Sequence, residues 1–210
     1  STDEVFGSLG EDGFFSEKTA YDPRSPYSSS KASSDHLARA WYHTFGLPIL
    51  ITNCSNNYGP WQFPEKLIPL TIMKAIKKQK IPLYGDGLNV RDWLYIDDHI
   101  DALLKVLEKG EKGKSYCIGG NGEINNLKLV QKICKIIDTI KPFKEPHESF
   151  INLVKDRPGH DRRYSIDSSF IQKELGWKAK FNLDKGLFIT VKWYINNFEW
   201  CNKISSKNNL

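Results

Sequence analysis

Short apolar runs alternate with amphipathic stretches along most of the chain, and this alternation is the main indication of its fold. Residues 47–52 (LPILIT) are apolar almost throughout and end in a polar residue, a pattern typical of a strand buried on both faces of a parallel sheet. Residues 26–45 carry a helical pattern that begins after Ser25, has Pro26 at its first position and ends at Gly46. By the same criteria, further helices are predicted over residues 65–78, 97–109, 126–139, 167–175 and 183–198, and further strands over residues 81–84, 91–95, 115–118 and 150–154.

The alternation of strands and helices predicts an α/β fold with a largely parallel sheet. Residues 2–6 are predicted to end a strand, and residues 7–26 hold the Gly, Ser, Asp and Pro residues typical of a loop. The elements are shorter and more irregular in the second half of the chain, which indicates a smaller lobe added to the sheet. We therefore assign residues 1–80 to the sheet domain and residues 81–200 mainly to the smaller lobe, with the chain passing between the lobes, and expect the polar residues 201–210 to fray.

The composition is that of a globular protein. Of the 210 residues, 40% are hydrophobic and 26% are charged, and no apolar run reaches the 18 residues expected of a membrane span. The net charge of +5 comes from interspersed residues rather than from a basic stripe, so nucleic-acid binding is not expected. The four cysteines form no CxxC pair and have no histidine at zinc-site spacing, so no metal is expected, and their apolar surroundings fit a reducing, cytoplasmic setting.

The start of the chain is unusual. It begins at Ser1, and its only methionine is Met73. No basic segment followed by an apolar one is present, so we expect no signal peptide. Because the chain starts within sequence that resembles a functional segment, we expect it to be a fragment of a longer protein.

Tyr27 and Lys31 form the first candidate catalytic pair. They lie four residues apart on a predicted helix and therefore share a face. A lysine ammonium beside a phenol favours the phenolate, which lowers the pKa of the tyrosine toward the range of a general base. The same spacing is common in ordinary surface pairs, and that interpretation stays open on the spacing alone.

Thr2, Asp3 and Glu4 form a second candidate. Adjacent carboxyl groups supply one general acid and one general base when their surroundings push their pKa values apart. Successive side chains on a strand point to opposite faces, so both reach one site only where the strand ends or bulges. The alternative is an ordinary acidic segment at the start of a loop.

Two further segments carry side chains suited to polar ligands. Residues 53–60 (NCSNNYGP) directly follow a predicted buried strand, where ligands of open α/β sheets bind, and their amides suit sugar hydroxyls or a carboxamide. Residues 156–163 (DRPGHDRR) hold three arginines that suit a pyrophosphate. The alternative for this second segment is a solvated turn with internal ion pairs.

Taken together and in this order, these segments resemble the extended short-chain dehydrogenase/reductase family, and within it the dTDP-glucose 4,6-dehydratases. The Tyr-x-x-x-Lys pair is shared across the superfamily, whereas Thr-Asp-Glu separates the 4,6-dehydratases from epimerases and decarboxylases. Phe6 stands where the family usually has tyrosine, which we expect to be a tolerated packing change. The matching blocks are STDEVFGS (1–8), DPRSPYSSSKASSDHLARA (22–40), TNCSNNYGPWQFPEKLIP (52–69), YGDGLNVRDWLYIDDH (84–99), DRPGHDRRYSID (156–167) and ELGW (174–177).

The resemblance implies the removal of water from dTDP-glucose, with NAD used and regenerated in each turnover. Tyr27 would take the proton of the C4 hydroxyl while hydride passes to the nicotinamide, and Lys31 would keep Tyr27 acidic and hold the nicotinamide ribose. Glu4 would be the base at C5, and Asp3 the acid that protonates the departing C6 hydroxyl. Thr2 would hydrogen-bond the C4 oxygen. Two adjacent carboxyl groups with opposite roles need different pKa values.

The resemblance also implies a set of ligand-binding residues, none of which is a metal ligand. Asn57 would contact NAD together with Tyr27 and Lys31, and Arg91 and Arg157 would bind the pyrophosphate of the substrate. The other implied nucleotide-sugar ligands are Thr2, Asn56, Lys66, Leu67, Pro82, Leu83, Tyr84, Asn126, Asp156, Pro158, Gly159 and His160.

One feature of the family is missing: the glycine-rich dinucleotide turn, a GxGxxG or GxxGxxG sequence after the first strand, does not stand before the Thr-Asp-Glu segment, where only Ser1 precedes Thr2. The family places this turn before the Thr-Asp-Glu segment, so the expected fold is the C-terminal part of a doubly wound, Rossmann-type parallel sheet with a smaller α/β substrate-binding lobe. We expect the chain alone to bind NAD poorly and to be inactive, and the complete protein to be a cytoplasmic homodimer built partly on the Tyr27 helix. Two alternatives stay open: another nucleotide-sugar dehydratase, epimerase or decarboxylase of the same family, or a non-catalytic nucleotide-sugar-binding domain.

Overall fold

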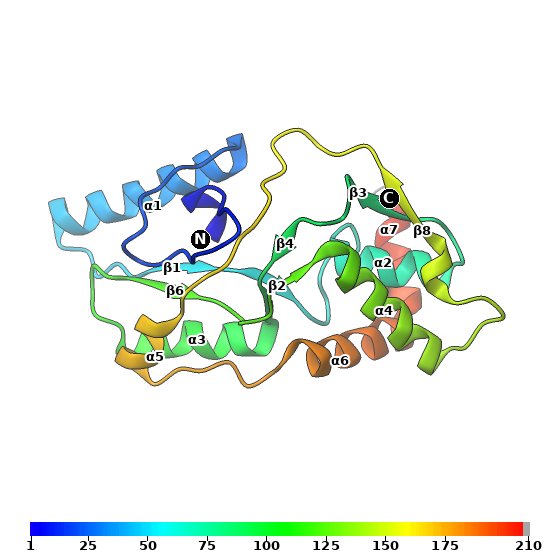
Figure 1. Ribbon diagram of the computed structural model, residues 1–210. Helices are drawn as coiled ribbons and strands as arrows, with labels where there is room; N and C mark the ends of the chain where they lie inside the picture. The colour runs from blue at the N-terminus through cyan, green and yellow to red at the C-terminus, as the bar shows by residue number, and fades with distance from the viewer. Residues whose placement is uncertain (208–210) are drawn as a thin grey trace. The chain divides into compact units, whose positions relative to one another are not determined.

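The computed structural model describes residues 1–207 and divides into two compact units, each built from three separate stretches of chain. The units interleave along the sequence, so that each strand-and-helix segment of one is followed by a segment of the other (Figure 1). Residues 58–80, assigned above to the sheet domain, lie in unit 2. Unit 1 comprises Ser1–Asn57, Val90–Glu123 and Gly159–Asn182, and unit 2 comprises Tyr58–Asn89, Ile124–Pro158 and Leu183–Leu210.

A parallel pair of strands forms the centre of unit 1. β1 (Ile51–Cys54) pairs with β6 (Ser115–Ile118) over the full length of both strands. On β6, Tyr116 and Ile118 belong to one buried cluster and Cys117 belongs to another. Because alternate side chains of a strand point to opposite faces, this pair is buried on both sides, as its apolar sequence predicts.

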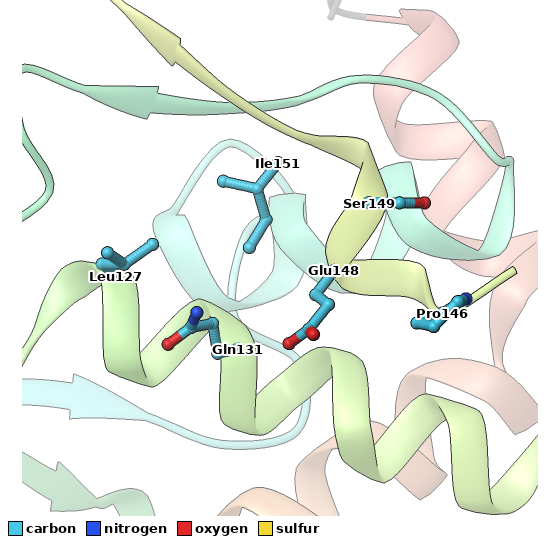
Figure 2. Close-up of a pocket in the computed structure, with 6 residues that line it drawn as sticks. All are labelled: Leu127, Gln131, Pro146, Glu148, Ser149 and Ile151. Carbon is cyan, nitrogen blue, oxygen red and sulfur yellow. The ribbon is translucent and has the colours of Figure 1, made fainter.

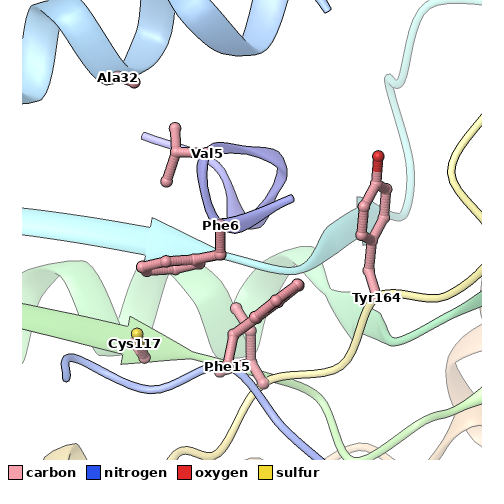
Figure 3. Close-up of a cluster of buried hydrophobic side chains, with 7 residues drawn as sticks. Val5, Phe6, Phe15, Ala32, Cys117 and Tyr164 are labelled. Atoms are coloured by element: carbon pink, nitrogen blue, oxygen red, sulfur yellow. The ribbon is translucent and has the colours of Figure 1, made fainter. Parts of the chain in front are cut away.

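Helices cover both faces of this strand pair. The 3-10 helix η1 (Asp3–Phe6) and α1 (Pro26–Phe45) pack on one face, and α3 (Ile96–Lys109) and α5 (Ser169–Leu175) pack on the other. Figure 3 shows the first cluster, which consists of Val5, Phe6, Phe15, Ala32, Cys117, Tyr164 and Ile166. The second consists of Leu94, Ala102, Val106, Tyr116, Ile118, Ile171 and Trp177. Helices on both faces of parallel strands are the arrangement of a doubly wound sheet.

The remaining strands of unit 1 are short. They are β4 (Val90–Arg91), β5 (Trp93–Tyr95) and β2 (Asn56–Tyr58), whose last residue belongs to unit 2. The strand predicted over residues 47–52 is shifted, because pairing starts only where β6 supplies a partner, and Leu47 is 42% exposed.

Unit 2 combines helices with a second parallel strand pair. On α4, Leu129, Ile133 and Ile137 are fully buried, and their spacing places them on one face of the helix. That helix packs against α2 and α6, and β3 pairs with β8. The elements of the unit are α2 (Leu67–Ile76), β3 (Ile81–Tyr84), β7 (Ile124–Asn125), α4 (Asn126–Ile140), the 3-10 helix η2 (His147–Phe150), β8 (Ile151–Val154), α6 (Leu183–Asn196) and α7 (Phe198–Lys207).

The C-terminal segment is helical where fraying was predicted. One helix over residues 183–198 was expected, but α6 ends at Asn196 and α7 then continues to Lys207. The ring of Trp200 lies 5.0 Å from that of Trp61 and 5.4 Å from that of Trp193, so apolar packing holds the start of α7 in place. The last part of the predicted tail, residues 208–210, lies outside the described residues.

Two structural features are absent from residues 1–207, a membrane-spanning helix and a metal-binding cluster. No helix in this range combines the length and the apolar character needed to cross a membrane. Nor do three or more His, Cys, Asp or Glu side chains gather there in an arrangement that suits a metal ion.

Candidate active site

The Thr2-Asp3-Glu4 segment turns where a strand was predicted to continue. Thr2 forms a parallel bridge with Cys54, and η1 begins at the next residue. Thr2 caps this 3-10 helix, because its Oγ1 accepts a hydrogen bond from the backbone N–H of Glu4 at 3.3 Å. The prediction that residues 2–6 form the end of a strand therefore holds only at Thr2, because residues 3–6 form a 3-10 helix. Successive side chains on a 3-10 helix are about 120° apart rather than opposite, which removes the geometric objection to Asp3 and Glu4 serving one site.

Asp3 has the surroundings of a general acid. Its side chain is 2% exposed. Burial, followed by the charges of Glu4 and Asp92, raises the pKa of Asp3 to about 7, although Thr2 and Arg91 act in the opposite direction. Thr2 Oγ1 donates to Oδ1 at 3.3 Å, while the buried Oδ2 has no hydrogen-bond partner within residues 1–207. A carboxyl group with this pKa still carries a proton in a large fraction of molecules near neutral pH.

Tyr27 stands at the start of α1. A reciprocal pair of hydrogen bonds between Ser25 and Ser28 caps this helix, as the sequence predicts. The Tyr27 side chain is 54% exposed, and burial, followed by the charges of Glu4, Cys54 and Asp3, raises its pKa. The predicted lowering of this pKa by Lys31 is therefore wrong for the chain by itself, since burial and then the nearby negative groups determine the direction. The effects of the Glu4 and Asp3 charges on this pKa show that Tyr27 lies near both carboxyl groups.

The two asparagines after β1 occupy the end of the parallel strand pair. Asn57 Nδ2 donates to Cys54 Sγ at 3.3 Å and to the Ser55 carbonyl at 3.1 Å. The backbone N–H of Asn56 donates to the Asp92 carbonyl at 3.0 Å, and its side-chain Oδ1 is buried without a partner in the described part of the chain. An unpaired buried acceptor at this end of a sheet is a position that a ligand donor satisfies.

Asp92 is a residue of this site that the sequence interpretation missed. It is buried, and its carboxylate accepts from the backbone N–H groups of Gly120 and Gly122 at 2.9 and 2.7 Å. A Cβ on Gly120 would lie 2.1 Å from the Trp93 carbonyl oxygen, so only glycine fits there. The sequence signal that could have indicated this residue is the pair of glycines directly after β6, Gly119 and Gly120.

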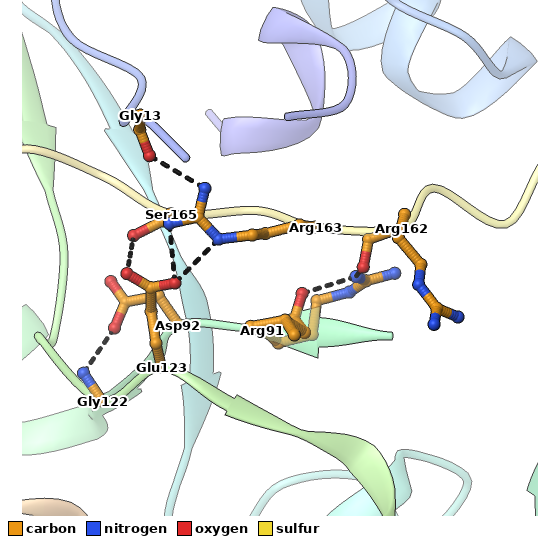
Figure 4. A network of polar contacts seen from close by, with 9 residues as sticks. Gly13, Arg91, Asp92, Gly122, Glu123, Arg162, Arg163 and Ser165 are labelled. Atoms are coloured by element: carbon orange, nitrogen blue, oxygen red, sulfur yellow. Dashed lines mark hydrogen bonds and ion pairs between the residues drawn. The ribbon is translucent and has the colours of Figure 1, made fainter. Parts of the chain in front are cut away.

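Two of the arginines considered for a pyrophosphate, Arg91 and Arg163, make contacts within the protein (Figure 4). Arg91 is buried, and it donates to the carbonyls of Val90 at 2.7 Å and Asp161 at 2.9 Å, with its guanidinium 4.2 Å above the Tyr164 ring. Arg163 pairs with Glu123 at 2.9 Å, so the alternative of internal ion pairs is the observed one for this residue. Arg91 therefore anchors the segment that follows the Pro-Gly turn, and its role as a pyrophosphate ligand stays a prediction.

The other predicted ligand residues fall in both units, and their environments differ. Gly159 and His160 belong to unit 1, whereas Asp156, Arg157 and Pro158 belong to unit 2 and are exposed.

Within unit 2, Leu83 is 1% exposed and forms part of the core, so its side chain does not face a ligand there. Tyr84, next to it on β3, is exposed, as the alternation of a strand requires. Lys66 occupies the N-cap position of α2 next to Leu67 without a capping side-chain hydrogen bond, and it pairs with Glu65 at 3.1 Å.

Pro82 is half-buried on β3. Asn126 is the first residue of α4, and its backbone N–H donates to the Asn89 carbonyl at 3.0 Å. Its side-chain Oδ1 is buried and has no hydrogen-bond partner in residues 1–207.

A shallow depression of about 420 Å³ in unit 2 is separate from these predicted residues (Figure 2). Its polar lining includes Glu148 and Ser149, both exposed. Neither residue belongs to the set implied by the sequence, and nothing buried and charged lines the depression. The lining residues are Leu127, Gln131, Pro146, Glu148, Ser149 and Ile151.

Comparison with known proteins gives this site its context. The chain is 55% identical over 202 residues to a dTDP-glucose 4,6-dehydratase of Xanthomonas campestris pv. campestris, a match that covers 95% of this chain and 58% of the relative. It is 50% identical over 215 residues to a dTDP-glucose 4,6-dehydratase of Salmonella typhimurium, covering 98% of this chain and 60% of that protein. A crystal structure of a dTDP-glucose 4,6-dehydratase from Bacillus anthracis in complex with NAD superposes with a TM-score of 0.90 at 50% identity, covering 97% of this chain and 63% of that one.

The chain thus spans less than two thirds of the length of these relatives. The predicted α/β fold of Rossmann type and the resemblance to the nucleotide-sugar dehydratases are both confirmed. The family model described as GDP-mannose 4,6 dehydratase matches residues 1–190, and the chain belongs to that family.

Proposed function

We propose that this protein acts as a dTDP-glucose 4,6-dehydratase, converting dTDP-glucose to dTDP-4-dehydro-6-deoxy-glucose with NAD. The observation that carries the proposal is the pair Asp3 and Glu4 on one 3-10 turn beside Tyr27, with the pKa of Asp3 raised to about 7. An elimination needs an acid for the leaving hydroxyl and a base for the C5 proton, and this turn carries two adjacent carboxyl groups of unequal burial. The name shared by relatives at 50–55% identity supports the same substrate.

The side chains divide the chemistry between them. When bound, NAD would supply the hydride chemistry at C4 and C6, and Tyr27, Lys31 and Asn57 would hold it. Tyr27 takes the proton of the C4 hydroxyl, and Thr2 hydrogen-bonds the C4 oxygen. Glu4 removes the C5 proton, which the C4 ketone has made acidic. Asp3 then gives its proton to the departing C6 hydroxyl, leaving a carboxylate that the buried surroundings disfavour.

The residues present fit part of a dinucleotide site. Tyr27, Lys31 and Asn57 would hold the nicotinamide end, and the unpaired buried acceptors of Asn56 and Asp3 leave room for ligand donors. The glycines spaced as GxxGxxG at residues 7–13 lie in a loop after a 3-10 helix, whereas the phosphate turn of this family joins a strand to a helix whose N-terminal backbone N–H groups bind the pyrophosphate. We therefore expect isothermal titration of the 210-residue chain with NAD to show no tight binding, and a low-micromolar dissociation constant would overturn this part of the proposal.

We also propose a homodimer built partly on α1. Leu37, Trp41 and Phe45 are 63, 50 and 64% exposed, and their spacing of four residues places them in one stripe. Trp41→Glu is expected to shift sedimentation toward the monomer, whereas His43→Glu, exposed on another face of the same helix, leaves it unchanged. An unchanged sedimentation coefficient for Trp41→Glu would contradict the dimer.

A cytoplasmic location completes the proposal. It is supported by Cys117, Cys134 and Cys201, which are all buried and unpaired. Cell fractionation checks it, and recovery from an oxidising compartment would contradict it.

The experiment uses the protein as its gene encodes it, with NAD and dTDP-glucose in deuterated water. Product analysis should show loss of water and deuterium at C5. Glu4→Gln should stop exchange at C5 while reduced nicotinamide still forms, and Glu11→Gln, in an exposed loop, is the matched control. Exchange at the normal rate in Glu4→Gln would remove Glu4 as the base. A 4-epimer formed without loss of water would identify an epimerase instead.

A further inference from the structure

Asp35 is a buried carboxylate on the same face of α1 as the candidate catalytic pair. Tyr27, Lys31 and Asp35 follow one another at intervals of four residues, so they form one stripe along the helix. Asp35 is 4% exposed, which is unusual for a charged side chain unless it is paired or hydrogen-bonded. The proposed reaction uses the first two residues of the stripe and leaves the third without a role.

The hydrogen bonds of Asp35 lead from α1 to the catalytic turn. Its Oδ2 accepts from Tyr21 Oη at 2.8 Å and from Asn53 Nδ2 at 3.2 Å. The same Asn53 amide nitrogen donates to the carbonyl of Thr2 at 3.2 Å. A single amide group on β1 thus joins the helix that carries Tyr27 to the residue that caps η1.

The direction of these hydrogen bonds is fixed by chemistry. Burial, followed by the hydrogen bond to Asp35, raises the pKa of Tyr21, so the phenol keeps its proton and donates it. The Asn53 nitrogen is a donor only. Asp35 therefore faces two donors, and one oxygen of its charged carboxylate accepts from both as a stronger acceptor than an amide oxygen. Asparagine at this position can present a donor in place of that oxygen.

The Tyr21 ring strengthens the position of the carboxylate. It packs edge-on against Phe6 at 5.3 Å between ring centroids, and the Arg39 guanidinium lies 5.4 Å above its centre. Phe6 is the last residue of η1. Tyr21 and Asn53 thus hold Asp35 to η1 from two directions, one through its last turn and one through its cap.

We propose that Asp35 is a positioning residue, which acts through Asn53 to hold the Thr2-Asp3-Glu4 turn in register with Tyr27 and Lys31. The inference rests on the proposed function for its catalytic consequence, but the coupling between α1 and η1 is a property of the chain itself. Loss of the Asp35 carboxylate frees the Asn53 amide to rotate and releases the Thr2 carbonyl. The acid, the base and the tyrosine are then still present, but their positions relative to one another are no longer fixed.

The first test is hydrogen exchange of the backbone amides of residues 2–7 in the 210-residue chain. Asp35→Asn is expected to speed exchange in this segment about tenfold, the loss expected for a buried hydrogen bond to a charged group. Asp12→Asn, in an exposed loop, is the matched control and leaves the rate unchanged. Equal rates in Asp35→Asn and Asp12→Asn would overturn the proposal, as would a rise spread evenly over all of unit 1.

An exchanged pair separates positioning from a general stabilising role. Asp35→Asn with Asn53→Asp restores one amide and one carboxylate in contact but leaves no donor for the Thr2 carbonyl. We expect this double variant to regain thermal stability while residues 2–7 still exchange fast. Recovery of slow exchange would overturn the proposal. If Asp35→Asn does not fold, Asn53→Leu carries the same expectation, because leucine has no donor for the Thr2 carbonyl and leaves the hydrogen bond from Tyr21 to Asp35 in place.

The catalytic consequence is measured in the protein as its gene encodes it, with NAD and dTDP-glucose. Asp35→Asn should lower kcat at least tenfold with KM for dTDP-glucose unchanged, because the residue touches neither ligand. Tyr21→Phe, which keeps the Asn53 link, should lower kcat less than threefold. A raised KM with unchanged kcat would overturn the positioning role. If the unaltered protein has no dehydratase activity, the proposed function fails, while the exchange measurements still decide the coupling.

Discussion

The raised pKa of Asp3 predicts a pH dependence of stability that one substitution removes. Burial, the charge of Glu4 and the charge of Asp92 move this pKa from 3.8 to about 7. Because the folded value lies above the unfolded one, the stabilising contribution is complete below pH 3.8, and it is lost as the pH rises to about 7. Above that pH the folded protein holds an ionised carboxylate that has little access to water.

The magnitude follows from linkage. A difference of about 3 pH units between the folded and unfolded pKa values corresponds to about 4 kcal/mol. Asp3→Asn keeps the shape of the protonated acid and does not ionise. The free energy of unfolding of Asp3→Asn should therefore increase relative to that of the parent chain as the pH rises from 4 to 8, by up to about 4 kcal/mol. Asp92, whose pKa is also raised by burial, is present in both proteins, so only its interaction with Asp3 enters the difference.

Urea unfolding followed by circular dichroism at half-unit pH steps measures this difference. Asp12→Asn, on an exposed loop, is the control, and its difference from the parent chain should stay flat with pH. A flat difference for Asp3→Asn as well, within about 0.5 kcal/mol, would show that Asp3 titrates near its ordinary pKa. The site would then lack a general acid at neutral pH, and the assignment of Asp3 to the leaving hydroxyl would fail.

Three substitutions test individual contacts within the two units and need only an unfolding measurement. Gly120→Ala should cost about 3 kcal/mol, because its Cβ would meet a carbonyl oxygen at 2.1 Å, whereas Gly10→Ala, with nothing within 4 Å, should stay within about 0.5 kcal/mol; equal effects would contradict the close approach. Asp98→Asn should cost about 2 kcal/mol, because its buried carboxylate accepts two backbone N–H groups at 2.9 to 3.0 Å, and an unchanged midpoint would mean that these donors find other partners. Lys132→Ala should cost less than about 1 kcal/mol, because its 2.7 Å pair with Asp184 is solvent-exposed, and a larger loss would reveal a role beyond that pair.

Local sequence patterns predicted the elements well where neighbouring residues decide the structure. The helix over residues 26–45 has the observed bounds, because Ser25 and Gly46 are local start and stop signals. The strand predicted over residues 47–52 was displaced, because the partner that it needs is distant in sequence. Residues 201–207 were expected to fray, because the sequence does not show that Trp200, at the start of the same helix, packs against Trp61 and Trp193.

The candidate site divides in the same way. The spacing of Tyr27 and Lys31 and the Thr-Asp-Glu triplet identify residues by type, and type is visible in a sequence. The burial of Asp3 is not visible, because it depends on packing between η1, α1 and the end of β1. The commitment of the Arg91 donors to backbone carbonyls also depends on a segment 70 residues away. Sequence thus indicated which groups are present, and only the fold determined which of them are buried or already engaged.

The two adjacent acids can take different roles because the chain makes a single short turn between Thr2 and Gly7. The bridge to Cys54 fixes Thr2 as the last extended residue. Gly7 ends the 3-10 helix with φ +91°, and a Cβ there would lie 2.8 Å from the Asp22 carbonyl oxygen. Within this turn Asp3 is buried and Glu4 is half-buried. Since burial is the largest cause of the raised Asp3 pKa, the turn itself gives neighbouring carboxyl groups different environments, and a straight strand would have given them opposite faces instead.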